Sequence, residues 1–257
     1  MYDLLSRDYD RFVNWPNRLA FEMPFLLKQL GSIKKPEGTP LRVLDAACGT
    51  GQHVLALAKE GMQAAGADLS LEMIRVAREN ASAAGADLCF EAVGFGSLAQ
   101  MFGEGNFDAL LCLGNSLPHL LTQTELASAL NDFHACLAPG GLLLIQNRNF
   151  DSVLAKHERW MDPQAHNEGE HQWVFQRFYD FEPDGLIRFN IVTLYREGSE
   201  EWRARLTSTH LFPQTHADLA AALTHAGFTN PRFFGSLGGG DFDTEKSGNL
   251  VITAIKD

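Results

Sequence analysis

Two acids and two glycines near residue 50 have the types and spacing of a small-molecule site. The stretch VLDAACGTGQHV, residues 43–54, is an apolar run that ends on Asp45, turns through Gly49 and Gly51, and continues with a helical pattern. Glycine is needed where a backbone approaches a ligand closely or takes a positive φ. Asp68 ends the next apolar strand, where a carboxylate can accept hydrogen bonds from both hydroxyls of a ribose. The pattern therefore predicts a nucleoside ligand.

The spacing disfavours a dinucleotide such as NAD. A dinucleotide fingerprint reads G-x-G-x-x-G, and its third glycine would fall at Val54. Asp45 lies directly under the turn, where a carboxylate is poorly placed beside a pyrophosphate. It can instead orient the amides of the turn or meet a cationic ligand. An NAD-dependent oxidoreductase is thus a weaker hypothesis than a cofactor without phosphate.

An acid four residues before G-x-G, followed by an acid on the second strand, is the pattern of class I S-adenosylmethionine-dependent methyltransferases. VLDAACGTG and GADLSLEMI resemble that family. Two later stretches, CLGNSLPHL at 112–120 and LLLIQNRNFDSVL at 142–154, resemble the glycine N-methyltransferase family and its bacterial glycine, sarcosine and dimethylglycine relatives. The resemblance runs from about residue 18 to 154 and weakens beyond it.

The resemblance implies a set of cofactor contacts. Arg18 would pair with the methionine carboxylate, Leu113 would present backbone near the sulfonium, and Met73 would pack on adenine, although its helical spacing is equally typical of a core residue. Where the family commonly has an amide followed by Trp, this chain has Gly94 and Phe95, so only stacking on adenine is retained. The full set for S-adenosylmethionine is Arg18, Asp45, Ala47, Gly49, Gly51, Asp68, Leu69, Met73, Gly94, Phe95 and Leu113.

The acceptor side is less sharply defined. Asn149 matches the family's acceptor-binding asparagine, and His119 follows a proline in a loop at the strand ends; these two are the candidate catalytic residues, as groups that position the acceptor. His119 could equally be a structural histidine. No catalytic base is assigned, because an amine need only lose its proton before attack. The expected substrate-binding residues are Tyr9, Asn115, Asn149 and Arg177, although Asn115 could cap a turn and Arg177 could form a surface ion pair.

Strand and helix patterns alternate from residue 41 onward, which predicts an α/β fold: a doubly wound, mostly parallel, seven-stranded Rossmann-like sheet. Residues 1–40 form an N-terminal helical segment that could close over the site as a lid, and residues 41–257 form the methyltransferase domain. Helical patterns occur at 17–30, 52–60, 70–84, 97–103, 123–137 and 215–226.

Residues 160–212, after the fifth strand, have a different hydrophobic periodicity. Polar and apolar residues alternate at period two over 171–181 and 185–196, and EPDG supplies a turn between them. A third alternating run covers 202–212. We expect an antiparallel β insertion, whose aromatic run WVFQRFYDF serves packing or a contact between copies in a homo-oligomer.

Composition narrows the function classes. The formal net charge of −11 disfavours nucleic acid and anionic membranes as partners. The four cysteines are dispersed among apolar residues, so we expect buried free thiols, no metal and a reducing cytoplasm. No apolar stretch has the length of a signal peptide or a membrane span.

The sequence thus favours a cytoplasmic, metal-free methyltransferase that uses S-adenosylmethionine to methylate the nitrogen of a small amine or amino acid. Two alternatives remain open: an O- or S-methyltransferase of a small metabolite, and a subunit that binds the cofactor without turnover. DNA amino-methyltransferases are disfavoured, because their D/N-P-P-Y motif is replaced here by L-G-N-S-L-P. Metal-dependent catechol O-methyltransferases are disfavoured as well, because the acidic metal ligands that they need near strands four and five are lacking.

Overall fold

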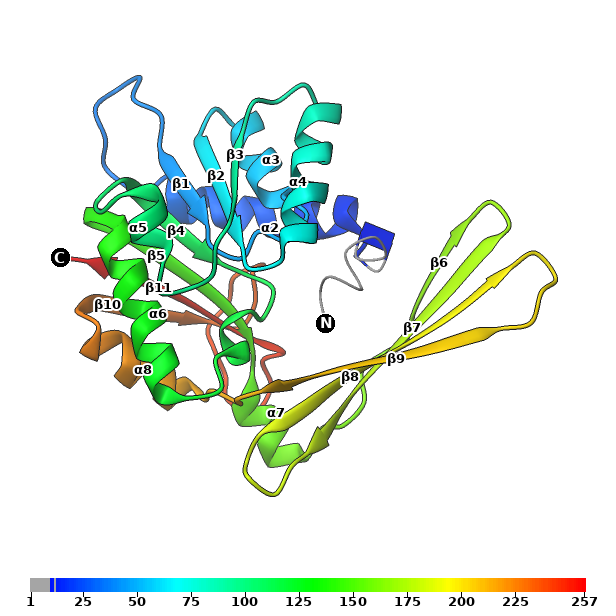
Figure 1. The fold of residues 1–257 in the computed structure, drawn as a ribbon. Coiled ribbons are helices and arrows are strands. Elements are labelled where there is room, and N and C mark those ends of the chain that lie inside the picture. Colours follow the sequence, from blue (N-terminus) through cyan, green and yellow to red (C-terminus); the bar gives the residue numbers. More distant parts are fainter. Residues whose placement is uncertain (1–9, 12) are drawn as a thin grey trace.

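The main domain is built on a seven-stranded sheet with the order β10-β11-β5-β4-β1-β2-β3 (Figure 1). This computed structural model describes residues 10, 11 and 13–257, so Tyr9 and the rest of residues 1–9, together with residue 12, lie outside the described part of the expected N-terminal lid. Only β11 runs antiparallel to its neighbours. The strands are β1 Arg42–Asp45, β2 Gln63–Asp68, β3 Cys89–Ala92, β4 Phe107–Cys112, β5 Leu137–Arg148, β10 Phe228–Phe234 and β11 Asn249–Lys256.

Helices cover both faces of this sheet, because successive residues of its strands point their apolar side chains to opposite faces, and each face forms a hydrophobic core. Val43 belongs to the cluster under α2, α3 and α4, whereas its neighbour Leu44 belongs to the cluster under α5, α6 and α8. The doubly wound prediction is therefore confirmed. The helices are α2 Trp15–Leu30, α3 Gln52–Lys59, α4 Leu71–Ala83, α5 Leu98–Phe102, α6 Gln123–Cys136, α7 Phe150–Lys156 and α8 His216–His225, with a 3₁₀ turn, η1, at Leu117–His119.

The strand order locates the edge of the sheet at which a ligand is expected to bind. β1 pairs in parallel with both β2 and β4, so the chain's winding reverses beside β1. In such sheets, ligands bind at the carboxyl ends of the strands at this switch point. The loops after β1, β2, β4 and β5 all leave the sheet at that edge.

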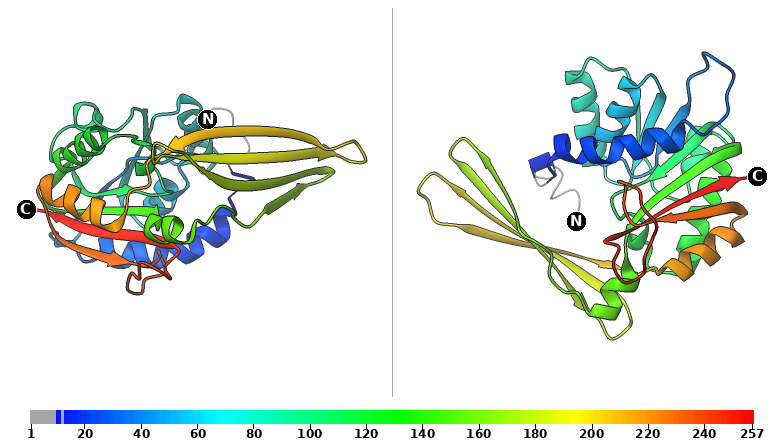
Figure 2. Two further views of the ribbon diagram at one scale, coloured as in Figure 1. Left: turned by 90° about the horizontal axis from the view of Figure 1, so that it is seen from below. Right: turned by 180° about the vertical axis from the view of Figure 1, so that it is seen from behind.

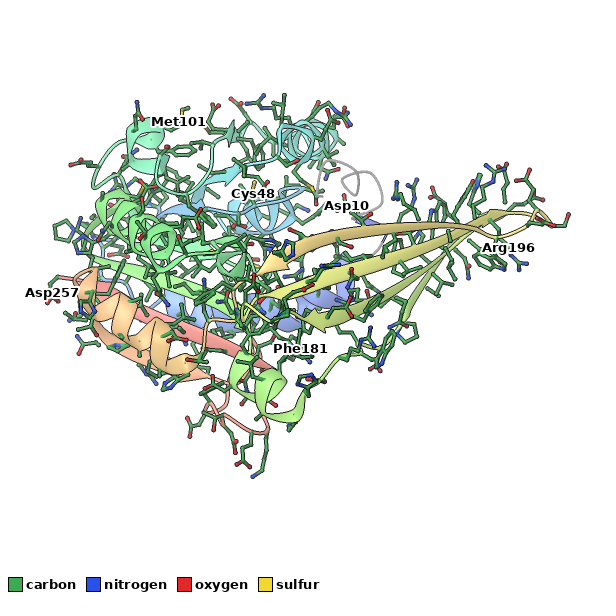
Figure 3. All side chains as sticks on the ribbon, turned by 60° about the horizontal axis from the view of Figure 1, so that its bottom comes forward. Asp10, Cys48, Met101, Phe181, Arg196 and Asp257 are labelled. Atoms are coloured by element: carbon green, nitrogen blue, oxygen red, sulfur yellow. The ribbon has the colours of Figure 1, made fainter. Side chains whose placement is uncertain are left out.

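The insertion after β5 is a second, four-stranded antiparallel sheet that extends away from the first (Figure 2). Its order is β6-β7-β8-β9, and the long β7–β8 hairpin pairs without interruption from His171↔Glu197 to Phe181↔Ile187. Figure 3 shows Phe181 near the main domain and Arg196 toward the far end. Sequence patterns locate the last three strands but miss β6. The strands are β6 Gln164–Glu168, β7 His171–Phe181, β8 Ile187–Glu197 and β9 Arg203–Leu211.

Three of the four thiols are buried as expected, but Cys89 is exposed. The difference has a simple cause: β3 is the edge strand of the sheet, and its burial pattern leaves Cys89 on the outside. Within the described residues, no helix combines the length and apolar character needed to traverse a bilayer.

A buried carboxylate on α6 fixes the loop that follows β3. Asp132 accepts backbone N–H groups from Gly96 at 2.7 Å, Leu98 at 2.8 Å and Ala99 at 2.9 Å. These groups would otherwise lack partners at the start of α5, because the first N–H groups of a helix have none within it. Asp132 thereby holds the segment that presents Gly94 and Phe95.

We predict that Asp132→Ala lowers the free energy of unfolding by about 2–4 kcal/mol, since three backbone donors, of which that of Leu98 is buried, lose a charged acceptor. Urea denaturation measures the change. As a control, Asp184→Ala removes a carboxylate that accepts one backbone bond on an exposed turn, and its effect is expected to stay within about 1 kcal/mol. Equal effects of the two substitutions would contradict this role.

Candidate active site

The glycine turn after β1 is joined to the end of β2 by one carboxylate. Asp68 Oδ2 accepts the Gly49 N–H at 3.0 Å, and Asp68 Oδ1 accepts the Ser70 N–H at 2.9 Å. Gly49 has a φ of 52°, a left-handed conformation that glycine adopts without strain. Each carboxylate oxygen can accept more than one hydrogen bond, so the group remains suited to ribose hydroxyls.

A cavity of about 450 Å³ opens beside this turn. It collects most of the expected cofactor residues from four loops of the sheet and from α2. The expected residues among its lining are Arg18, Ala47, Gly49, Asp68, Leu69, Met73, Gly94, Phe95 and Leu113; Trp15, His53, Ser116, His119 and Thr209 also contribute. We call this the cofactor pocket.

Two expected cofactor residues do not line the cofactor pocket. Gly51 has a φ of 80° and lies behind the turn, where an added Cβ would come within 2.9 Å of the Phe90 ring. Its need for glycine is therefore explained by packing. Asp45 lies fully buried beneath the turn and accepts the Ala47 N–H at 3.3 Å, which agrees with the expectation that it orients the amides of the turn.

The apolar end of the cofactor pocket is formed after β2 and β3. Phe95 packs edge-on against Phe133, with ring centroids 5.1 Å apart, and this contact fixes the orientation of its ring. Met73 is buried, while Leu69 is 81% exposed at the rim. A planar base could enter between these groups, whereas Gly94 offers only backbone for hydrogen bonding.

At the opposite end, a charged network from α2 reaches under the turn. Glu22 accepts Arg18 Nε at 3.0 Å through one oxygen and bonds His53 Nε2 at 2.7 Å through the other. Burial would raise the pKa of Glu22, but the hydrogen bond from His53 and the positive charge of Arg18 outweigh it and hold that pKa below its usual value. Glu22 thus holds the Arg18 side chain at this end of the cofactor pocket. Sequence reasoning found Arg18 but missed Glu22 and His53.

A segment preceding α2 also touches the turn. Asp10 Oδ1 accepts Trp15 Nε1 at 2.7 Å and Thr50 Oγ1 at 2.6 Å. Because Thr50 lies between the two glycines, these bonds join the N-terminal segment to the glycine turn beside the cofactor pocket.

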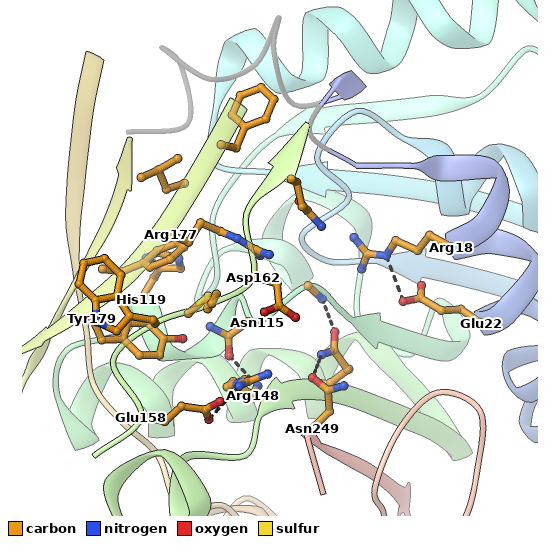
Figure 4. Close-up of a pocket in the computed structure, with 18 residues that line it drawn as sticks. Arg18, Glu22, Asn115, His119, Arg148, Glu158, Asp162, Arg177, Tyr179 and Asn249 are labelled. Atoms are coloured by element: carbon orange, nitrogen blue, oxygen red, sulfur yellow. Dashed lines mark hydrogen bonds and ion pairs between the residues drawn. The ribbon is translucent and has the colours of Figure 1, made fainter. Parts of the chain in front are cut away.

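A second cavity, of about 670 Å³, adjoins the cofactor pocket (Figure 4). Both cavities share Arg18, Gly114 and His119, so these residues mark their junction. The second cavity lies between the end of β5 and the insertion sheet; we call it the acceptor pocket. Its other polar lining residues are Glu22, Asn115, Gln146, Arg148, Glu158, Asp162, Gln164, Arg177, Tyr179 and Asn249.

Side-chain amides fix the loop after β4 against β5. Asn115, at a φ of 66°, accepts the Arg148 backbone N–H through Oδ1 at 2.8 Å. Gln146 accepts the Gly114 N–H at 2.8 Å and donates to Asn249 Oδ1 at 3.1 Å. These bonds cross-link three elements, so the junction of the two pockets is held in place.

Strand alternation separates the polar residues at the end of β5. Gln146 and Arg148 face the acceptor pocket, whereas Asn147 is fully buried and donates to Gln214 at 3.3 Å. Arg148 pairs with Glu158 at 2.9 Å, and its Nε is buried without a hydrogen-bond partner among the described residues. Arg148 was not among the expected site residues. It could have been predicted from Gln146, because residues two apart on a strand point to the same face.

Asn149 is placed differently from the expectation that it binds the acceptor. Its side chain is 99% buried, accepts the Ser152 N–H as the N-cap of α7, and donates to the carbonyls of Thr244 at 3.0 Å and Ser247 at 2.9 Å. It lines neither pocket. These bonds join α7 to the loop before β11, and the acceptor-binding role expected of Asn149 stays a prediction.

His119 lies at the junction of the two pockets, and its role in positioning the acceptor stays a prediction. Burial lowers its pKa to about 4. The imidazole is therefore neutral near pH 7 and acts as a hydrogen-bonding group rather than a cation. Burial likewise raises the pKa of Tyr179, which lines the acceptor pocket from β7, to about 12, so its hydroxyl remains protonated near pH 7.

The residues present fit S-adenosylmethionine. The cofactor pocket offers a carboxylate at the ribose position, an aromatic and apolar end, and a guanidinium fixed by Glu22. It lies above the buried Asp45, a favourable place for a ligand with positive charge. Among the residues that the structure describes, no group of three or more His, Cys, Asp or Glu is arranged to hold a metal ion.

Comparison with known proteins agrees with this fit. Residues 43–141 match the family described as "Methyltransferase domain". A crystal structure of an S-adenosylmethionine-dependent methyltransferase from Clostridium acetobutylicum superimposes with a TM-score of 0.76 at 15% identity, covering 99% of this chain and 98% of that one. The sugar N-methyltransferase KedS8 from Streptoalloteichus sp. gives 0.75 at 22% identity, covering 100% and 92%. Residues 43–141 thus resemble a methyltransferase domain, and the whole chain shares the fold of these two solved methyltransferases.

The curated proteins that are similar in sequence include glycine/sarcosine N-methyltransferases. A glycine/sarcosine N-methyltransferase of Halorhodospira halochloris is 34% identical over 181 residues, which are 70% of this chain and 64% of that protein. The enzyme of the same name from Aphanothece halophytica is 36% identical over 146 residues, or 57% and 53%. The chain thus spans less than two thirds of the length of these curated relatives.

We predict that Asp45→Asn stabilises the ligand-free protein at pH 8. Burial raises the pKa of Asp45 from 3.8 to about 6. Its stabilising contribution is therefore present below about pH 4 and lost as the pH rises through about 6, by up to about 3 kcal/mol. Urea unfolding between pH 4 and 8 measures this loss, which the variant should lack.

The control for this prediction is Asp87→Asn, which removes a carboxylate from the exposed turn before β3. Its stability should follow the wild-type pH dependence. Parallel curves for wild type and Asp45→Asn would contradict the buried-acid explanation.

Proposed function

We propose that this protein is an S-adenosylmethionine-dependent N-methyltransferase that acts on a small amine or amino acid. The observation that carries the proposal is the meeting of the cofactor and acceptor pockets at Arg18, Gly114 and His119. The similarity to glycine/sarcosine N-methyltransferases supports nitrogen as the methylated atom. The net charge of −11 agrees with a dissolved acceptor in the cytoplasm rather than a nucleic acid.

In this proposal, the residues of the cofactor pocket bind S-adenosylmethionine and orient it. When bound, S-adenosylmethionine supplies a methyl group for in-line displacement. Asp68 accepts the ribose hydroxyls, Arg18 pairs with a carboxylate, and Phe95 contacts the base. The chain's contribution to the rate is to hold donor and acceptor in line within an enclosed site.

The acceptor pocket orients a small zwitterion or amine. Arg177 on β7 and Arg148 on β5 line it from two sides, and guanidinium groups suit a carboxylate. His119, being neutral, can accept a hydrogen bond from an amine that has lost its extra proton. No residue needs to act as a strong base, because deprotonation of the amine precedes attack.

Cofactor binding tests the first half of the proposal. Calorimetric titration with S-adenosylmethionine and S-adenosylhomocysteine should give binding that Asp68→Asn weakens at least tenfold, since charged acceptors for the ribose hydroxyls are lost. Asp87→Asn should bind as wild type, and NAD should not bind. Binding of both ligands without methyl transfer to any amine would instead favour a non-catalytic subunit.

Acceptor kinetics test the second half. With glycine, sarcosine and dimethylglycine as acceptors, we expect Arg177→Gln to raise KM about 10–100-fold with a smaller change in kcat, because one charged hydrogen bond to the carboxylate is lost. Arg188→Gln is the matched control, since Arg188 is an exposed hairpin arginine paired with Glu182. An unchanged KM in Arg177→Gln would contradict carboxylate recognition by this residue.

A further inference from the structure

Four side chains at the end of the cofactor pocket opposite Phe95 contact one another in a closed ring. Glu22 accepts Arg18 Nε through Oε1 at 3.0 Å, and its Oε2 bonds His53 Nε2 at 2.7 Å. The Trp15 ring meets the His53 ring edge-on, with centroids 5.4 Å apart. Arg18 Cζ lies over the same Trp15 ring, 5.0 Å from its centroid. We call these four residues the Arg18 cluster.

The Arg18 cluster borders both pockets. Trp15 and His53 line the cofactor pocket, and Glu22 lines the acceptor pocket. Arg18 lines both. In Figure 4, its side chain extends from α2 into the acceptor pocket, with Glu22 beside its Nε. A ligand at the junction therefore meets Arg18, and the other residues of the cluster decide where that guanidinium lies.

His53 connects α2 with the glycine turn. It is the second residue of α3, which begins directly after Gly51, and its partner Glu22 on α2 is 31 residues away in the chain. Because Glu22 also holds Arg18, the position of Arg18 is set relative to the turn that lines the cofactor pocket.

Two bonds to different oxygens fix the plane of the Glu22 carboxylate. The terminal torsion of a glutamate is broad when nothing restrains it. Without His53, the carboxylate would be held from the Arg18 side alone, and the two side chains could rotate together. A carboxylate only accepts hydrogen bonds, so His53 acts on it as a donor through Nε2. His53 is therefore placed to orient Arg18 through Glu22.

Stability alone does not account for this buried pair. The side chains of His53 and Glu22 are only 4% and 11% exposed. Taking charged groups out of water is costly, and apolar residues of similar volume often stabilise a fold as well as a buried ion pair does. A demand for one fixed geometry explains the pair better, and the group whose geometry it fixes is Arg18.

We propose that His53 and Glu22 are positioning residues for the amino acid end of S-adenosylmethionine. His53 orients Glu22, and Glu22 orients Arg18, so that the guanidinium pairs with the carboxylate of the cofactor. This inference rests on the proposed function and assigns to its cofactor site two residues that the sequence motifs do not indicate.

Two ligands separate this role from general support of the fold. S-adenosylhomocysteine carries the amino acid carboxylate, whereas 5′-methylthioadenosine has the same adenosine and sulfur without the amino acid. His53→Leu removes the bond to Glu22 and retains a side chain of similar volume. In calorimetric titrations of this variant, S-adenosylhomocysteine should bind about tenfold more weakly, and the affinity for 5′-methylthioadenosine should change less than about twofold.

The control is His134→Leu. His134 on α6 packs edge-on against Phe228, with ring centroids 5.2 Å apart, and lines neither pocket. This variant should bind both ligands as the wild type does. Equal losses of both ligands in His53→Leu would indicate mere support of the fold and overturn the proposal. An unchanged affinity for S-adenosylhomocysteine, or the same selective loss in His134→Leu, would overturn it as well.

Further variants test whether His53 acts through Glu22. His53→Gln retains an N–H donor at about the reach of the imidazole and should restore S-adenosylhomocysteine affinity to within about threefold of wild type. Glu22→Leu should weaken this ligand at least as much as His53→Leu does. The double variant should lose no more than Glu22→Leu alone, because residues of one network are not additive. Additive losses, or a glutamine variant as weak as the leucine variant, would contradict the relay.

The outcomes also separate this inference from the proposed function. A wild-type protein that binds neither S-adenosylmethionine nor S-adenosylhomocysteine would overturn both. Wild-type binding without the selective loss in His53→Leu would overturn this inference alone. The selective loss in a protein that transfers no methyl group to any amine would support the positioning role and overturn the proposed function alone.

Discussion

The bridge that Asp68 forms between the Gly49 and Ser70 amides is the interaction on which the cofactor pocket depends. A parallel sheet brings the ends of β1 and β2 side by side, but it leaves the amides of the following loops without partners. One carboxylate satisfies an amide from each loop and so fixes both loops relative to each other. The same carboxylate is the group that we propose accepts the ribose hydroxyls, so under that proposal folding and ligand binding both require an acid at residue 68.

The neighbouring strand ends are joined in the same way, by amides instead of a carboxylate. Asn115 and Gln146 connect the loop after β4 with β5, and Asn249 extends the connection to β11. Because these groups are neutral, they fix the junction of the two pockets without adding charge beside His119. Arg18 is the charged side chain at the junction itself, and Arg148 and Arg177 line the acceptor pocket.

The sequence was sufficient for the sheet, the glycine turn and the antiparallel insertion, because these depend on local periodicity and on glycine. It was less informative where the partners are distant in the chain. Asn149 carries a motif position of the family, yet its environment is set by the loop containing Thr244 and Ser247, about 95 residues away. The network of Glu22 and His53 likewise joins two helices across the fold. Such contacts leave no periodic signal in either segment.

In the insertion sheet, successive residues of a strand point to opposite faces, so only every second side chain lines a pocket. On β7 and β8, inward-facing side chains such as Arg177, Ile191 and Thr193 line pockets, while outward-facing ones such as Val174 and Val192 do not. The sheet is held by backbone bonds that are indifferent to side-chain identity. Evolution or design could therefore change the acceptor by replacing alternate residues of one hairpin, leaving the methyl-donor machinery untouched.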